Sequence, residues 1–443
     1  MFTSPEKYRN SSIYSIFVRN YSEKGTFHEV VHDLERIKAM GFDIIWLMPI
    51  HPIGKKNRKG SLGSPYSISD FFKINPEYGT ENDFKSFIQR AHELNLKVII
   101  DVVYHHTSWD SRLMDEKPDW FYHKKDGTIG NKVGDWSDIA DLDFRHSELW
   151  HYLYDALEKW ASIGVDGFRC DVAPLIPIEF WKYARNKIES NGYELIWLSE
   201  SVEPSFITYL RHNGFNVHSD SEVYSVFDML YDYDIKNNFL DFVNGGDLTE
   251  YLNAISRQEY TYPKRYVKMR YMENHDNPRA KFLIKNRRRL INFTAFMMFL
   301  KGSYLFYNGQ ETMTDHVPGL FDKDTIKWEM DQDIIELTKA LNIIKKMDFI
   351  RDGNLYLNAL TLDTAEIKYE YGDYCYTGLF NIGMNEESSK NLINEITTDK
   401  ENEILFSGSE IIAKGISKLE PTITLPLIYK SKRIEKNETG IIS

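Results

Sequence analysis

Cysteine is nearly absent from this chain, which has only Cys170 and Cys375 among its 443 residues. Two thiols cannot form a disulfide framework, so the composition favours a reducing compartment. No apolar run is long enough to span a bilayer. The first residues also lack the basic and then apolar pattern of a signal peptide. The sequence therefore predicts a cytoplasmic protein with no membrane partner.

Positive charge is also in short supply, with 54 Lys and Arg against 66 Asp and Glu, a net charge of -12. Such a surface repels nucleic acids and anionic lipids, so neither is expected as a partner. The common metal-binding patterns, HExxH, paired cysteines and the EF-hand loop, are missing as well. Aromatic residues, in contrast, are abundant and make up 14% of the chain. They suit a sugar-binding surface or a Tyr-rich core.

The length exceeds what one hydrophobic core supports, roughly 250–300 residues, so we expect one large domain with smaller ones attached. Strand-like and helix-like stretches alternate through most of the chain, which predicts an α/β fold with a parallel sheet, a (β/α)8 TIM barrel. Thr80 is the expected N-cap of one helix, and Gly41 is expected to end another. The predicted strands are 12–18, 43–50, 97–103, 165–171, 195–199, 216–218, 266–273 and 304–308. The predicted helices are 27–40, 81–94, 147–162, 178–190, 279–300 and 333–346.

Two regions break this alternation. Residues 104–140 are polar and aromatic and too long for an ordinary loop, so they predict a short inserted domain after the third strand. From residue 351 to 443 the helical period disappears and alternating stretches such as 367–371 predict a C-terminal antiparallel β domain. Residues 1–103 and 141–350 would then form the barrel. The basic run 287–289 is predicted to be a solvated helix face.

Polar side chains follow the predicted strands at the end where barrel enzymes carry their active sites. The set comprises Asp101, His105, His106, Arg169, Asp171, Glu200, Asn274, His275 and Asp276. A structural ion pair, such as Asp171 with Arg169, would explain one of them, but buried charge is too costly for that explanation to cover all. A metal site is the chemical alternative, because His and Asp clusters also bind divalent ions.

Glycoside hydrolysis needs such a set of side chains. One carboxylate attacks the anomeric carbon and one carboxylic acid protonates the leaving oxygen, about 5–5.5 Å apart in retaining enzymes. A third carboxylate can stabilise the positive charge of the transition state. An arginine beside the nucleophile keeps it ionised, and histidines donate hydrogen bonds to sugar hydroxyls.

At these residues the sequence resembles the α-amylase family, glycoside hydrolase family 13, over about residues 10–350. The matching segments, in the family's order, are 101–106, 141–143, 167–173, Glu200 with the four residues before it, 274–276 and 302–311. The resemblance implies that Asp171 is the nucleophile, Glu200 the general acid/base and Asp276 the transition-state stabiliser. It also implies substrate binding by Tyr66, His106, Arg169 and His275. No cofactor is required on this basis.

The chain departs from the family's pattern at two motifs. His105 stands where the family has an asparagine that often ligates a structural calcium ion. Calcium prefers oxygen ligands, so histidine argues against that calcium site. After the nucleophile the chain has Pro174 and Leu175 in place of a frequent Lys-His pair, so the usual acceptor-side contacts are not expected. The short inserted segment leads to the hypothesis of a shallow site for short oligosaccharides.

The function predicted from the sequence is retaining hydrolysis of α-1,4-glucosidic bonds in maltooligosaccharides or starch-like α-glucans. An α-1,6-glucosidase or a glucosyl transferase of the same family is the nearest alternative. Of other classes, a catalytically inactive carbohydrate-binding barrel and a metal-dependent barrel hydrolase remain open.

Overall fold

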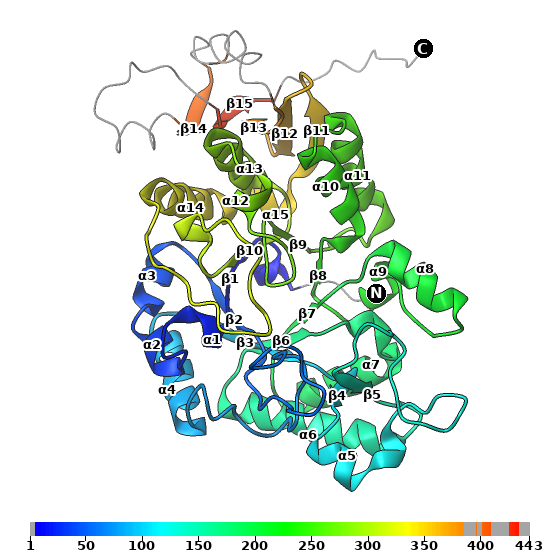
Figure 1. Ribbon diagram of the computed structural model, residues 1–443. Coiled ribbons are helices and arrows are strands. Elements are labelled where there is room, and N and C mark those ends of the chain that lie inside the picture. Colours follow the sequence, from blue (N-terminus) through cyan, green and yellow to red (C-terminus); the bar gives the residue numbers. More distant parts are fainter. Residues whose placement is uncertain (1–4, 385–395, 397–400, 409–424, 434–443) are drawn as a thin grey trace.

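A closed barrel of parallel strands forms the centre of the computed structural model, which describes residues 5–384, 396, 401–408 and 425–433 (Figure 1). Its strands are β1 (Ser12–Ile16), β2 (Ile44–Leu47), β3 (Lys97–Val102), β6 (Gly167–Cys170), β7 (Ile196–Ser199), β8 (Met229–Tyr231), β9 (Lys268–Tyr271) and β10 (Ser303–Tyr307). Around the barrel their order is β1-β10-β9-β8-β7-β6-β3-β2. The predicted (β/α)8 barrel is confirmed.

Helices surround the barrel and connect its strands (Figure 1). They are α1 (Val18–Tyr21), α2 (Phe27–Val31), α3 (Leu34–Ala39), α4 (Glu81–Glu93), α6 (Ser147–Ile163), α7 (Ile178–Ser190), α8 (Pro204–His212), α9 (Asp220–Val223), α10 (Lys236–Val243), α11 (Leu248–Thr261), α12 (Ala280–Leu283), α13 (Arg287–Phe299), α14 (Gln332–Lys345) and α15 (Asp348–Asp352). Among the residues described, no helix combines the length and apolar character needed to cross a bilayer.

Local sequence signals explain where these helices begin and end. Thr80 caps α4 as predicted, because its hydroxyl accepts the Asp83 amide while the Asp83 side chain accepts the Thr80 amide. Gly41 follows α3 with a φ of 92°, which only glycine adopts without strain. The predicted helix 27–40 is two helices, α2 and α3, and the predicted helix 279–300 is likewise α12 and α13.

One strand prediction was wrong. The sixth barrel strand is β8, not residues 216–218, which the structure leaves outside any strand. β8 has only three residues and pairs with its neighbours through Met229, Leu230 and Tyr231. A strand this short contains too few residues to show a periodic pattern in the sequence.

The hydrophobic core has two layers. Inside the barrel a compact cluster includes Ile13, Trp46, Ile99 and Leu198. The larger cluster lies between the outer face of the strands and the surrounding helices. Because both faces of the strands are buried, the strands are nearly continuous in apolar residues. This packing fixes the positions of the strand ends. The polar residues of the predicted site lie at those ends.

Two smaller units are attached to the barrel. Within residues 104–141, β4 (His106–Ser108) and β5 (Ile139–Asp141) pair antiparallel, and α5 (Arg112–Glu116) lies in the connection between them. The predicted C-terminal antiparallel sheet is present, with the order β11-β12-β13-β15-β14 (Figure 1). Its strands are β11 (Asn354–Ala359), β12 (Thr364–Tyr371), β13 (Tyr374–Asn381), β14 (Glu403–Ser407) and β15 (Leu427–Lys432). Residues 385–395, 397–400, 409–424 and 434–443 of the predicted C-terminal domain lie outside the described residues.

The basic run 287–289 is not a uniformly solvated face, contrary to the prediction. Arg289 is buried, and it donates hydrogen bonds from Nε to the Ile382 carbonyl (2.8 Å) and from Nη1 to the Val243 carbonyl (3.2 Å). Arg287 forms ion pairs with Asp331 and Asp333. α13 packs against β13, so Arg289 joins the C-terminal sheet to the barrel helices, whereas Arg287 connects α13 to the start of α14.

Arg289→Ala is therefore expected to destabilise the protein by about 2 kcal/mol, because two buried carbonyls lose their donor. Urea unfolding followed by tryptophan fluorescence measures the loss. Lys285→Ala, an exposed basic residue just before α13, is the matched control and is expected to change stability little. Equal urea midpoints for the two variants would contradict this role.

Candidate active site

A cleft of about 510 Å³ opens at the carboxyl ends of the barrel strands. Six of the seven predicted site residues line it, namely Tyr66, His106, Asp171, Glu200, His275 and Asp276. The seventh, Arg169, is fully buried and holds two of these side chains from beneath. The remaining lining residues are Lys59, Ser64, Trp136, Asp138, Ile139, Val172, Ser201, Val202, Glu203, Phe206, Tyr233, Lys236, Leu320 and Phe321.

The barrel backbone holds the two central carboxylates in place. The Asp171 amide donates to the Val102 carbonyl (2.9 Å), and the Glu200 amide donates to the Cys170 carbonyl (3.0 Å). The hydrogen bonds of the sheet thus continue one residue beyond β6 and β7. Side chains mounted on such a backbone are more rigidly positioned than side chains on loops.

Val172, directly after Asp171, has a left-handed backbone with φ 36° and ψ 42°. A β-branched residue rarely adopts this conformation, so the turn is strained. The Val172 amide donates a hydrogen bond of 2.8 Å to Glu200 Oε2. The strained turn therefore links the end of β6 to the carboxylate that follows β7.

Arg169 is the charge centre of the site. Its Nη1 lies 2.9 Å from Asp101 Oδ1 and 2.7 Å from Asp171 Oδ1, and its Nη2 lies 2.9 Å from Glu200 Oε1. Its Nε donates to the Tyr231 hydroxyl (3.1 Å). Three carboxylates share one buried guanidinium, so the cation cannot neutralise all of them when they are ionised.

Burial accordingly raises the pKa of these carboxylates, opposed by the positive charge of Arg169. The pKa of Glu200 rises to about 8, that of Asp101 to about 7 and that of Asp171 to about 6. Near neutral pH, Glu200 therefore keeps its proton while Asp171 is the most readily ionised of the three. This is the division that an acid and a nucleophile require.

Tyr66, His275 and Asp276 form a second connected group at the cleft. The Tyr66 hydroxyl donates to Asp101 Oδ2 (3.0 Å) and lies 2.7 Å from His275 Nε2, with the two rings stacked at 5.3 Å. His275 Nε2 is also 3.1 Å from Asp276 Oδ2. Burial lowers the pKa of His275 to about 4, so the ring is neutral and acts as a hydrogen-bonding group.

The segment after the nucleophile is apolar, in keeping with the departure seen in the sequence. Leu175 is buried in a cluster with Val172 and Val202, and Trp136 and Phe206 pack against it. Because Leu175 is directed into this cluster, the wall of the cleft beside it is apolar. The cleft therefore has apolar side chains next to this segment, among them Val172, Val202 and Trp136.

Sequence reasoning missed several residues of the site. Tyr231 lies in β8, the strand whose position was predicted wrongly, and Tyr233 follows that strand. Asp101 was expected at this end of the barrel, but its contacts with Arg169 and Tyr66 are visible only in three dimensions. Trp136 lies in the inserted segment, where no pattern marks it.

One cluster in the described part of the chain could hold a metal ion, and it comprises His105, His106 and Asp141. All three side chains are buried. Calcium takes six to eight oxygen ligands, whereas this cluster offers two ring nitrogens and one carboxylate. The residues present do not fit the family's structural calcium ion.

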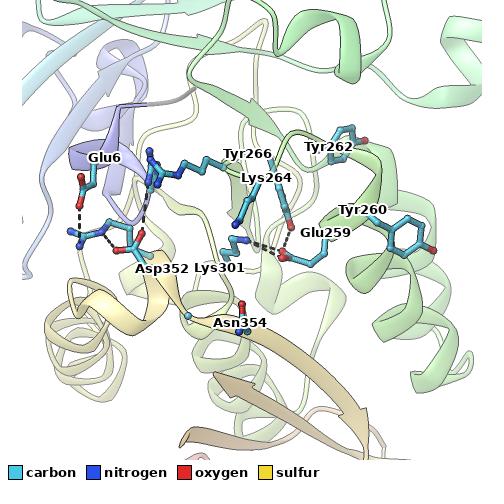
Figure 2. Close-up of a pocket in the computed structure, with 13 residues that line it drawn as sticks. Glu6, Glu259, Tyr260, Tyr262, Lys264, Tyr266, Lys301, Asp352 and Asn354 are labelled. Atoms are coloured by element: carbon cyan, nitrogen blue, oxygen red, sulfur yellow. Dashed lines mark hydrogen bonds and ion pairs between the residues drawn. The ribbon is translucent and has the colours of Figure 1, made fainter. Parts of the chain in front are cut away.

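A second cavity, of about 590 Å³, lies at the opposite end of the barrel (Figure 2). It is bordered by residues that precede β1, β9 and β10. Charged side chains here pair with one another, as Lys301 does with Glu259 (2.9 Å) and Arg351 with Asp352 (2.7 Å). In barrel enzymes this end contributes to stability, not to catalysis.

Comparison with known proteins agrees with this geometry. The family model described as alpha amylase, catalytic domain, matches residues 4–139 and 133–354. The chain belongs to the α-amylase family. The family segments identified in the sequence lie at the ends of barrel strands: they overlap β3, contain β6, β7 and β10, and follow β9.

Two solved structures of α-amylases resemble this family member closely. An α-amylase from Lactobacillus plantarum is 42% identical, with a TM-score of 0.85 and coverage of 96% of this chain and 100% of the other. A noncanonic maltogenic α-amylase from Thermotoga neapolitana is 35% identical, with a TM-score of 0.75 and coverage of 84% and 86%.

Curated relatives differ in their activity. Alpha-amylase MalA from Haloarcula japonica is 30% identical over 323 residues, which are 70% of this chain and 45% of the relative. An α-1,4-glucan:maltose-1-phosphate maltosyltransferase from Salinibacter ruber is 34% identical over 245 residues, 49% of this chain and 37% of the relative. The matched part spans less than half the length of either relative.

Proposed function

We propose that this α-amylase family member hydrolyses α-1,4-glucosidic bonds in maltooligosaccharides or starch-like α-glucans, with retention of configuration. The observation that carries the proposal is the pair Asp171 and Glu200, bound to the two terminal nitrogens of Arg169 at the mouth of the barrel. A retaining glycosidase needs two carboxyl groups close together, one ionised and one protonated. The raised pKa of Glu200 supports that assignment.

The reaction would proceed in two steps. Asp171 attacks the anomeric carbon while Glu200 gives its proton to the departing glycosidic oxygen, which forms a covalent glycosyl-enzyme. Glu200, now ionised, removes a proton from water, which attacks the anomeric carbon and releases Asp171. Asp276, on the same cleft, would stabilise the positive charge that develops on the sugar ring in both transition states.

The other predicted residues would bind the sugar at the cleavage site. Tyr66 presents an aromatic face on which a pyranose ring can stack, and its hydroxyl is held by Asp101. Neutral His275 and His106 can donate hydrogen bonds to sugar hydroxyls without adding charge. Arg169 is buried beneath the cleft, so its role would be to hold Asp171 and Glu200. The short inserted segment supports a preference for short oligosaccharides.

Glucosyl transfer is the second candidate, and two observations favour it. A curated relative is named a maltosyltransferase, and the wall formed by Val172, Val202, Trp136 and Phe206 is apolar. Such a wall favours a sugar acceptor over water at the second step. An inactive carbohydrate-binding barrel gains no such support, because it would have no use for the shared, buried carboxylates.

The product profile from maltoheptaose separates these proposals. Hydrolysis predicts shorter sugars such as maltose and maltotriose, released first as the α-anomer in NMR spectra. Products longer than maltoheptaose would show transfer. Early release of the β-anomer would contradict the retaining mechanism. The cytoplasmic location stays a prediction.

A further inference from the structure

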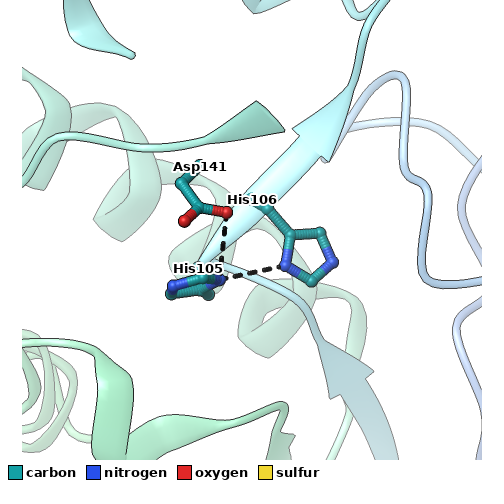
Figure 3. Close-up of side chains that lie close together, drawn as sticks. All are labelled: His105, His106 and Asp141. Atoms are coloured by element: carbon teal, nitrogen blue, oxygen red, sulfur yellow. Dashed lines mark hydrogen bonds and ion pairs between the residues drawn. The ribbon is translucent and has the colours of Figure 1, made fainter. Parts of the chain in front are cut away.

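In the His105, His106 and Asp141 cluster, one ligand atom from each residue lies within 4.8 Å of the other two, and two of the separations are close to those of a metal site. His105 Nδ1 lies 3.2 Å from His106 Nδ1 and 3.6 Å from Asp141 Oδ1, and Figure 3 shows the three groups converging. A tetrahedral ion with bonds of about 2.0–2.1 Å to its ligands requires them to be about 3.3–3.4 Å apart. The two separations lie on either side of that value.

Hydrogen bonds among these three side chains do not provide a partner for every buried polar atom of the cluster. Asp141 Oδ1, the oxygen nearest the His105 ring, is buried and has no hydrogen-bond partner in the described structure. One proton on His105 Nδ1 can serve either His106 or Asp141, but not both. A buried carboxylate oxygen without a donor is costly. A cation accepts a lone pair from each of the three atoms at once, which a single proton cannot do.

We propose that His105, His106 and Asp141 bind one divalent transition-metal ion of the Zn²⁺ type, and not calcium. Imidazole nitrogens suit zinc, cobalt and nickel, whereas calcium prefers oxygen. Asp141 Oδ2 already accepts the Lys132 amide (2.8 Å), which orients the carboxylate so that Oδ1 faces the histidines. All three ligands come from the paired strands β4 and β5 or the residue just before β4.

Such an ion would have two consequences for the active site. It would join the two strands of the inserted segment, β4 and β5, to each other. It would also bind His106 at Nδ1, which places the ring proton on Nε2, the nitrogen directed away from the cluster (Figure 3). Because His106 lines the catalytic cleft, the ion would fix a hydrogen-bond donor for the sugar.

Cobalt titration of the full chain tests the proposal. Co²⁺ in a tetrahedral N,N,O site has strong visible absorption bands, so binding is seen directly. His28 and His32 need to be replaced first, because these exposed residues lie one helical turn apart with their Nε2 atoms 3.2 Å from each other, and can chelate metal alone. In the His28→Asn, His32→Asn background we expect one equivalent of Co²⁺ to bind, Zn²⁺ to displace it, and Ca²⁺ to have no effect.

Two variants made in the same background locate the site. His105→Asn substitutes an amide for one ring, and Asp141→Asn changes a single atom and keeps the shape. Each is expected to weaken Co²⁺ binding by more than about 100-fold. Replacing even a residue outside the ligand shell typically lowers metal affinity 10–100-fold. Circular dichroism shows whether each variant folds. If His105→Asn does not fold, the result for the near-isosteric Asp141→Asn decides whether the cluster binds the ion. Absence of Co²⁺ binding in the background protein, or unchanged binding in the variants, would overturn the proposal.

Discussion

Asp171→Asn is expected to lower kcat on maltoheptaose by roughly 10⁴-fold or more, because removal of a nucleophile abolishes the covalent step. An amide is similar in size but is not nucleophilic. Arg169 retains its contacts with Asp101 and Glu200 (both 2.9 Å), so the variant is expected to fold and to bind oligosaccharide. Steady-state kinetics and calorimetric binding of maltoheptaose measure the two effects separately.

The matched control is Asp166→Asn, at the other end of the same strand. Asp166 accepts hydrogen bonds from Lys97 Nζ (2.9 Å) and the Val98 amide (2.8 Å), so it too is an ion-paired aspartate beside β6. Its loss should reduce stability and leave kcat within a few-fold of the wild type. If Asp171→Asn retains a substantial fraction of the wild-type kcat, Asp171 is not the nucleophile.

Glu200→Gln is expected to lower kcat on maltooligosaccharides by about 10²–10⁴-fold, the usual contribution of a general acid. With maltosyl fluoride as the substrate, the leaving group needs no proton. The rate of the first chemical step should then fall far less in this variant. Glutamine can still accept the Val172 amide, so the strained turn beside the nucleophile is preserved. Glu194→Gln, just before β7, is the control, since Glu194 lies at the surface and forms an ion pair there with Lys7.

The pH profile provides an independent readout of the same residue. The wild-type rate requires Glu200 protonated and Asp171 ionised. It should therefore fall above a pKa of about 8, as Glu200 loses its proton, and below about 6, as Asp171 gains one. Glutamine does not titrate, so Glu200→Gln should lack the alkaline limb. An alkaline limb that persists unchanged in the variant would assign it to another group.

Long, strongly patterned elements were predictable from the sequence. Barrel strands buried on both faces are continuous apolar runs, and α4 has a capping sequence at Thr80, so both could be recognised from local residues. β8 could not, because three residues carry no period and its place depends on pairing with β7 and β9. The burial of Arg289 likewise depends on the C-terminal sheet that packs on α13.

For the site, the sequence by itself determined which chemical groups follow the strands, since family motifs are local strings of residues. Such strings are enough to nominate Asp171, Glu200, Asp276 and their four partners as candidates. Only the tertiary structure decided what these groups do to one another. The pKa of Glu200 depends on its burial and on one guanidinium shared with Asp101 and Asp171, and the approach of Asp141 to His105 depends on strand pairing between remote segments. Burial and distance between remote residues are properties of packing, and a local string of residues does not specify them.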